Sequence, residues 1–148
     1  MRRLLTAASA RSEGELIYGD WTVREMLVHI AAWDRELVRG LDELLRGRRP
    51  SFADYDQAAF NAHALADAEH ETLEDVIEDA KVAHSALVDS IAALSDQDWE
   101  RTSPFRWRTG NPMSVASLFQ YTYKGQTHYA GHADEIEHRS SRESDTVR

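Results

Sequence analysis

Residues 22–46 read TVREMLVHIAAWDRELVRGLDELLR, and this stretch decides the fold. Its apolar side chains recur at the i, i+3, i+4 and i+7 spacing of an amphipathic α-helix. Thr22 is a suitable N-cap, and the run from Gly47 to Pro50 would end the helix. The predicted buried stripe consists of Val23, Met26, Leu27, Ile30, Trp33, Leu37, Leu41, Leu44 and Leu45. The segment therefore predicts one long helix with a single face in a core.

Outward from this helix, the same periodicity predicts three more main helices, over residues 3–16, 72–94 and 114–139. Thr72 and Asp75 resemble a capping box at the start of one of them. A polar crossover with a short helix at residues 55–68 joins the second and third main helices, and no segment reads convincingly as a strand. We expect an all-α four-helix bundle in one domain, residues 1–139, followed by a disordered tail, residues 140–148.

The composition argues against several classes of function. There are 17 Lys and Arg against 26 Asp and Glu, and this net charge of -9 argues against a nucleic-acid partner. No apolar run approaches the roughly 20 residues that cross a bilayer, so we expect no membrane association and a cytoplasmic protein. The chain has no cysteine, which leaves histidines and carboxylates as possible metal ligands and excludes a protein thiol nucleophile.

Three histidines are expected to meet at a seam between two helices. His128 and His132 are four residues apart and lie one turn apart on the same side of a helix. At about 100° per residue, His29 lies on the same rotational flank of its own apolar stripe. Two helices that share a core turn that flank toward each other only if they are antiparallel, and the register of the residues agrees. The pattern therefore predicts a three-histidine site for a divalent metal, with a position left open for water or substrate.

Other residues on this flank have two interpretations each. Trp33, Met26 and Tyr121 would either wall an apolar substrate pocket or form the edge of the core. Lys124 is a candidate substrate contact. Glu25 or Glu135 would act as a general base, orient an imidazole, or belong to a solvated rim.

A second pair of polar residues falls near the middle of two apolar faces. Asp34 and His84 lie about equally far from the starts of their helices. If the second and third main helices run parallel, the two side chains would meet as a buried ion pair. Such a pair needs no functional role.

Two motifs give the chain a resemblance to a known family. WTVREMLVHIAAWD, at residues 21–34, and HYAGHADEI, at residues 128–136, are similar to the two histidine-bearing helices of the DinB/YfiT-like superfamily. YDQAAFN at residues 55–61, followed by TLEDV at residues 72–76, resembles the ClbS/DfsB-like branch, in which Asn61 occupies the position of an F-N motif. Asn61 would line the mouth of the pocket, or instead satisfy backbone groups of the crossover.

The resemblance covers residues 4–136 and implies a specific architecture. It implies an up-down-down-up bundle, often dimeric, with a zinc- or nickel-type site at His29, His128 and His132. The link between the first helix and Trp21 is short for the family, so the first helix is expected to be abbreviated or shifted.

The activities that the resemblance implies are broad. They include hydrolysis of a small reactive compound, and transfer or isomerisation reactions that use a low-molecular-weight thiol, as in detoxification or a stress response. The leading hypothesis is a metal-dependent enzyme of this kind. Two alternatives stay open: a protein that binds or sequesters a small molecule without turnover, and a dimeric helical scaffold whose histidines are incidental.

Overall fold

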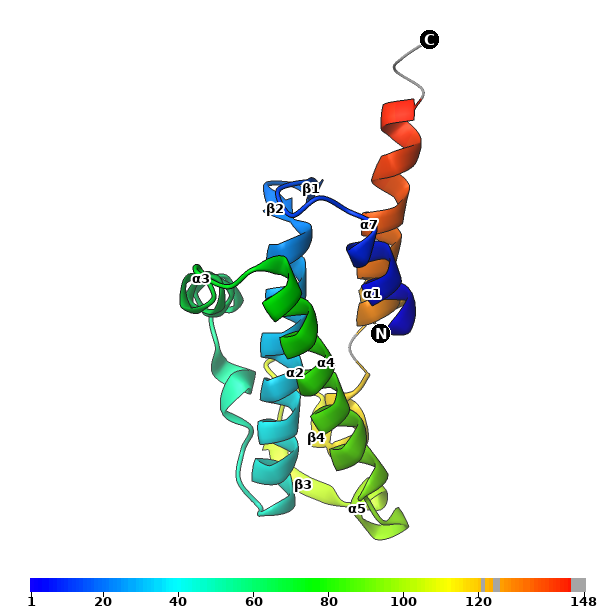
Figure 1. Cartoon of the computed structure of the whole chain (residues 1–148). Helices are drawn as coiled ribbons and strands as arrows, with labels where there is room; N and C mark the ends of the chain where they lie inside the picture. Colours follow the sequence, from blue (N-terminus) through cyan, green and yellow to red (C-terminus); the bar gives the residue numbers. More distant parts are fainter. Residues whose placement is uncertain (121, 124–125, 145–148) are drawn as a thin grey trace.

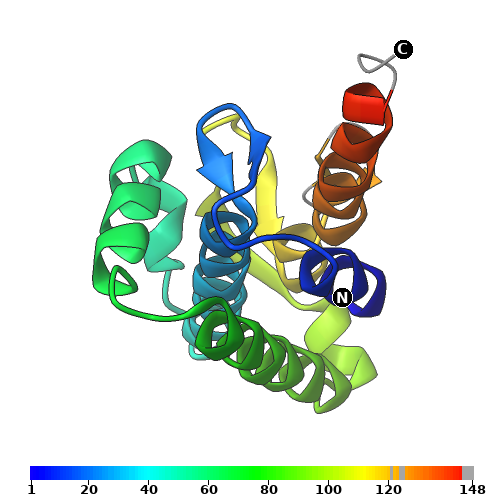
Figure 2. The ribbon, with the colours of Figure 1, turned by 45° about the horizontal axis from the view of Figure 1, so that its top comes forward.

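The computed structural model of the protein describes residues 1–120, 122–123 and 126–144. Its longest elements are α2 (Val23–Leu45) and α4 (Leu73–Ala92), which lie side by side and run in the same direction (Figures 1 and 2). Both helices begin where the sequence predicts, at the capping threonines Thr22 and Thr72. Each threonine hydroxyl accepts the backbone N–H three residues on, and the carboxylate of that residue accepts the threonine N–H in return.

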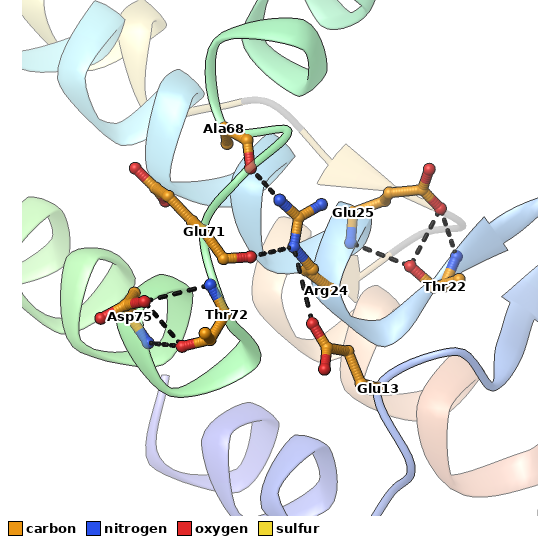
Figure 3. Close-up of polar contacts among 8 residues, drawn as sticks. All are labelled: Glu13, Thr22, Arg24, Glu25, Ala68, Glu71, Thr72 and Asp75. Carbon is orange, nitrogen blue, oxygen red and sulfur yellow. Dashed lines mark hydrogen bonds and ion pairs between the residues drawn. The ribbon is translucent and has the colours of Figure 1, made fainter.

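The crossover between these helices is fastened to the start of α2 (Figure 3). It contains the 3-10 turn η1 (Ser51–Asp54) and the helix α3 (Gln57–Asp67). The guanidinium of Arg24 donates hydrogen bonds to the carbonyl of Glu71, at 2.7 Å, and to the carbonyl of Ala68 just after α3. Since both carbonyls belong to the end of the crossover, Arg24 holds α3 beside α2.

The first and last helices pack on each other. α1 (Arg2–Ser9) lies against α7 (His128–Ser144), and Arg3 bonds Asp134, at 2.7 Å, and Glu137. The predicted first helix over residues 3–16 is abbreviated, as the short link implied, because the chain turns into the hairpin of β1 (Leu16–Tyr18) and β2 (Trp21–Thr22).

The predicted helix over residues 114–139 is wrong in its first half. Among the residues described there, the helical ones are those of α6 (Val115–Leu118), and the antiparallel pair β5 (Thr122–Tyr123) and β6 (Gln126–Thr127) follows. This stretch is rich in aromatic and β-branched residues, which favour strands over helices. The last helix, α7, therefore begins at His128.

The expectation that no segment forms a strand is also wrong. Besides the two hairpins above, the predicted loop over residues 95–112 contains α5 (Asp96–Glu100) and strand β3 (Thr102–Arg106), which pairs with β4 (Pro112–Ser114). Gly110, with a φ of 84°, lies in the turn between these two strands, a conformation that favours glycine. These three pairs are short, and the described structure is mostly helical.

The core divides into a larger cluster around the start of α2 and a smaller one around its end. The larger cluster joins Met26 and Ile30 to residues of α1, α4 and α7 such as Leu4, Val76 and Ile136. The smaller one joins Leu41 and Leu44 of α2 to the β4–α6 region, at Met113, Val115 and Leu118. Among the described residues, no helix is long and apolar enough to cross a membrane.

The boundary predicted at residue 139 is not tested by these features and stays a prediction. α7 itself continues to Ser144, and residues 145–148 of the expected tail lie outside the described part of the chain.

Candidate metal centre

Three histidine side chains converge between α2 and the start of α7. The Nε2 atom of His128 lies 3.2 Å from Nε2 of His29 and 2.9 Å from Nε2 of His132. Each of the three residues offers a ring nitrogen, and these nitrogens all lie within 4.8 Å of one another. α2 and α7 run in opposite directions (Figure 1), so the predicted convergence of the two helices' histidines is confirmed.

The start of α7 explains why two of the histidines share one side. The hydroxyl of Thr127 accepts the backbone N–H of Ala130, at 3.4 Å, so the helix begins immediately after this threonine. His128 is then the first residue of the helix and His132 follows one turn later on the same face. His29 lies two turns into α2.

Asn61 of α3 determines which nitrogen of His29 faces the site. The Oδ1 atom of Asn61 lies 3.0 Å from the indole Nε1 of Trp33 and 3.1 Å from Nδ1 of His29. An indole N–H is only a donor, so the atom of Asn61 between the two rings is the carbonyl oxygen. Nδ1 of His29 must then carry the proton, and its Nε2 presents a lone pair to the other histidines.

Glu135 determines which nitrogen of His132 faces the site. Its carboxylate lies 2.8 Å from Nδ1 of His132, and both side chains are buried. The carboxylate accepts the Nδ1 proton, which leaves the lone pair of His132 on Nε2. This contact places Glu135 as the residue that orients an imidazole, one of the roles that the sequence left open.

Burial keeps two imidazoles of the site, those of His29 and His128, neutral. Removal from water is the main cause that lowers the pKa of His29 to about 4, and the neighbouring His132 adds to it. Burial likewise lowers the pKa of His128 to about 3, with His132 and His29 contributing. Neutral imidazoles are the form that binds a metal, so neither His29 nor His128 has to lose a proton near pH 7.

The donor set fits a divalent cation. Nitrogens bound at about 2.0–2.1 Å to a tetrahedral zinc ion lie roughly 3.4 Å apart, close to the two separations measured from His128 Nε2. Two lone pairs, on His29 and His132, point at Nε2 of His128, and a single N–H there can serve only one of them. A cation would satisfy all three nitrogens at once. His29, His128 and His132 could therefore bind a divalent metal.

Two tryptophan rings pack edge-on against His29. Trp21 lies edge-on to it with 5.2 Å between ring centroids, and Trp33 does so at 6.4 Å. Trp33 in turn packs on Phe60 of α3, at 4.8 Å. The sequence interpretation included Trp33 but not Trp21, although Trp21 opens the same motif and precedes the capping residue of α2 directly.

The other predicted site residues have different surroundings. Glu25 accepts hydrogen bonds from the backbone N–H of Thr22, at 2.7 Å, and from its hydroxyl, at 2.9 Å, so its carboxylate caps α2 (Figure 3). Met26 is fully buried in the larger core cluster, the packing position that the sequence left open. Tyr121 and Lys124 lie outside the described residues.

The predicted pair of Asp34 and His84 is confirmed in position. His84 Nδ1 lies 3.5 Å from Asp34 Oδ2, and the Asp34 side chain is almost completely buried. A third residue, which the sequence did not indicate, completes the group: the hydroxyl of Tyr129 in α7 donates to Oδ1 of Asp34.

Comparison with known proteins assigns the family. The sequence model of the DinB superfamily matches residues 4–134, which include all three histidines and both motif helices. No curated protein and no solved structure gives a significant match. The family match covers most of the chain, and the chain belongs to the DinB superfamily.

Proposed function

We propose that this protein is a metal-dependent enzyme of small reactive electrophiles, with the metal held by His29, His128 and His132. A divalent cation bound there would act as a Lewis acid that activates water or the sulfur of a thiol. The observation that supports the proposal is the convergence of three ring nitrogens, two of which are fixed as lone-pair donors by Asn61 and Glu135.

Residues of the chain orient the metal-binding imidazoles and cover one of them with apolar surface. Asn61 and Glu135 hold the rings of His29 and His132 in the ligating tautomer. Trp21 and Trp33 cover the side of His29 with apolar surface, which suits an uncharged substrate. Because the chain has no cysteine, the nucleophile in this proposal is water or an added low-molecular-weight thiol.

Several finer features belong to the same proposal. The metal is zinc or nickel, since imidazole donors suit both, and the activity is hydrolysis or thiol S-transfer in detoxification. The bundle has the up-down-down-up order, the chain belongs to the ClbS/DfsB-like branch, and it acts as a cytoplasmic homodimer on a small-molecule substrate. The family resemblance of the motifs at residues 21–34, 55–61 and 128–136 supports these features.

One observation favours a second candidate function, binding or sequestration of a small molecule without turnover. Both carboxylates that the sequence offered as general bases are engaged, Glu25 with Thr22 and Glu135 with His132. If neither of these two carboxylates transfers a proton, the site would bind a ligand without converting it.

Metal content is the first test. Purified protein loaded with zinc or nickel and then desalted should retain about one equivalent, measured by mass spectrometry of the elements. His29→Ala should retain less than half an equivalent. His63→Ala is the matched control, because His63 is a largely exposed histidine on α3 and should leave the metal content unchanged. Equal metal content in wild type and His29→Ala would rule out the site.

Activity separates the two candidate functions. The metal-loaded protein is incubated with a panel of small electrophiles, such as epoxides and activated alkenes, with and without a low-molecular-weight thiol. Turnover that disappears on chelation and returns with metal supports the enzyme. Saturable binding of a compound without product supports sequestration, and turnover that survives chelation contradicts the metal mechanism.

A further inference from the structure

A buried polar group joins the three helices α2, α4 and α7 close to the metal centre. Asp34 of α2 is 1% exposed. Its Oδ1 accepts the hydroxyl of Tyr129, the second residue of α7, and Nδ1 of His84 in α4 lies 3.2 Å from the same hydroxyl. The rings of His84 and Tyr129 meet edge to face with 4.9 Å between centroids. We call Asp34, His84 and Tyr129 the junction triad.

The junction triad is costly to bury. Burial raises the pKa of Asp34, although the Tyr129 hydroxyl and His84 oppose this. Within the described part of the chain, Oδ2 of Asp34 accepts no hydrogen bond. Nδ1 of His84 lies 3.5 Å from this oxygen, which is an ion-pair distance. A buried carboxylate that is incompletely satisfied lowers stability. A gain in stability therefore does not explain why this position of α2 holds an aspartate.

The start of α7 must hold a fixed position on α2 if His128 is to stay beside His29. α7 begins after the β5–β6 hairpin, so it does not inherit its orientation from α6. It packs chiefly on α1 and meets α2 over a much smaller contact. His128 is its first residue, where helix ends fray most readily. Yet Nε2 of His128 must stay within about 3 Å of two other ring nitrogens.

The junction triad meets this need by adding a second point of attachment between the same two helices. Tyr129 follows His128 directly in α7, and Asp34 lies five residues after His29 in α2. At 1.5 Å per residue, the two contacts on α2 are separated by about 7.5 Å along the helix axis. Two contacts at that separation fix both the height and the rotation of the first turn of α7, which one contact does not.

We propose that Tyr129 and Asp34 are positioning residues of the metal centre: their hydrogen bond holds the first turn of α7 on α2 and thereby places His128 against His29, with His84 holding the Tyr129 hydroxyl in line. This inference rests on the proposed metal centre. It concerns the formation of the three-nitrogen site and is independent of which reaction follows.

Cobalt binding to the full chain tests this role. Co²⁺ affinity is measured by competition with a chelator, and the visible absorption of the saturated protein reports the ligand geometry. Tyr129→Phe removes only the hydroxyl and should weaken Co²⁺ binding by about 10- to 100-fold, as loss of a residue that orients a ligand typically does. Its spectrum at saturation should differ from that of the wild type, because His128 no longer has one fixed orientation.

Two further variants distinguish positioning from general stabilisation. Asp34→Asn keeps an oxygen acceptor for the tyrosine hydroxyl and should bind Co²⁺ within a few-fold of wild type, whereas Asp34→Ala should bind as poorly as Tyr129→Phe. Leu118→Ala is the control, since Leu118 belongs to the smaller core cluster, which contains no residue of α7 or of the junction triad. It should unfold at a lower temperature and keep the wild-type affinity and spectrum.

The outcomes separate this inference from the proposed function. If the wild type fails to bind Co²⁺, the metal centre itself is wrong and the positioning role falls with it. If the wild type binds and Tyr129→Phe matches it in affinity and spectrum, only the positioning role is overturned. If Tyr129→Phe does not fold, Asp34→Asn against Asp34→Ala makes the same comparison, and equal affinities of those two variants would overturn the role.

Discussion

At the scale of single residues, one amide oxygen selects the ligating nitrogen of His29. Asn61 Oδ1 accepts both the Nδ1 proton of His29 and the indole proton of Trp33, so it orients two rings at once. We predict that Asn61→Ala weakens zinc binding by about 10- to 100-fold, because the imidazole then rotates and changes tautomer freely. Competition with a chromophoric chelator measures the change.

Two matched variants make this prediction specific. Asn61→Asp keeps an acceptor for both donors, so its zinc affinity should equal or exceed that of the wild type. Trp33→Phe removes the other donor to the same oxygen while leaving His29 bound to it, so its effect should be the smaller one. An Asn61→Ala variant with wild-type affinity would show that His29 needs no partner to hold its tautomer.

The lowered pKa values of His29 and His128 predict how the metal-free protein responds to acid. Between about pH 6.5 and pH 4, the unfolded chain binds protons at these histidines and the folded chain does not. The free energy of unfolding must therefore fall as the pH drops through this range, and the contribution levels off below about pH 3. Urea unfolding of chelator-treated protein at a series of pH values measures the slope.

A variant isolates the histidine contribution. Asp34, whose pKa is raised by burial, contributes a slope of opposite sign, so the wild-type profile is a sum. His29→Asn removes one titrating group and should be less sensitive to acid than the wild type over the same range. Parallel pH profiles for the two proteins would contradict the neutral, buried state of His29.

The sequence predicts the three histidines of the site better than it predicts their hydrogen-bond partners. The three histidines follow from helical periodicity, because flank and register within one helix are set by the 3.6-residue repeat. The hydrogen bond between His29 and Asn61 cannot be predicted in this way. Asn61 lies in the crossover, and helical periodicity does not determine the path of a crossover relative to α2. Glu135, three residues from His132 on the same helix, was a candidate partner for that reason.

At the scale of elements, the capping box of α2 gives Glu25 a structural task. Thr22→Ala should cost about 1 kcal/mol of stability, in the range typical of a lost N-cap. Glu25→Ala should cost a similar amount, and the double variant should cost less than the sum, because both changes break one reciprocal pair. Thermal unfolding of the four proteins in this cycle measures the coupling.

The equivalent box on α4 is the control for this cycle. Thr72→Ala should lower stability by a similar amount, since Thr72 and Asp75 make the same pair of contacts. If Glu25→Ala abolished turnover while Thr72→Ala and Thr22→Ala did not, Glu25 would have a catalytic role in addition to the cap.

Helix starts were predictable from the sequence, whereas the continuity of the last helix was not. Thr22 and Thr72 mark the starts of their helices, because each capping box is formed by residues only three positions apart. In residues 114–139, apolar spacing fitted a helix throughout, but the aromatic and threonine-rich middle pairs as strands instead. Spacing does not reveal this switch, because a hairpin gains its hydrogen bonds from a partner strand whose position depends on the tertiary fold.

Gly40 is a glycine that α2 needs for packing. A Cβ built there would lie 2.3 Å from Phe52 Cε1 and 3.3 Å from Pro50 Cβ, so the phenyl ring of η1 would have to move. We predict that Gly40→Ala destabilises the protein by up to about 2 kcal/mol, since the overpacking cost of about 1–3 kcal/mol is set against a gain of about 1 kcal/mol in helix propensity. Denaturant unfolding measures whether the substitution lowers or raises the free energy of unfolding.

Gly14→Ala is the control for this change. No atom lies within 4 Å of a Cβ added to Gly14, so this substitution should alter stability by less than about 0.5 kcal/mol. A stabilised Gly40→Ala protein would mean that Phe52 swings aside at little cost.

At the scale of the whole molecule, the candidate metal centre lies between two helix pairs. α2 packs on α4, α1 packs on α7, and the direct contact of α2 with α7 is small (Figure 2). His29 belongs to one pair, and His128 and His132 belong to the other. A bound cation would therefore link segments that are about a hundred residues apart in the sequence, in addition to the apolar core cluster that α1, α2, α4 and α7 share.

This arrangement predicts that metal stabilises the entire fold and not only the site. A ligand that binds only the folded state adds about 2.7 kcal/mol at a free concentration of 100 times its Kd. For a chain of 148 residues, each kcal/mol raises the Tm by roughly 2–4 °C, so saturating zinc should raise it by about 5–10 °C. His29→Ala should lose this shift while His63→Ala keeps it. A Tm of the wild type that is independent of zinc, in protein shown to bind one equivalent, would mean that the unfolded chain binds the metal as tightly as the folded chain, and that the metal does not bridge the two helix pairs.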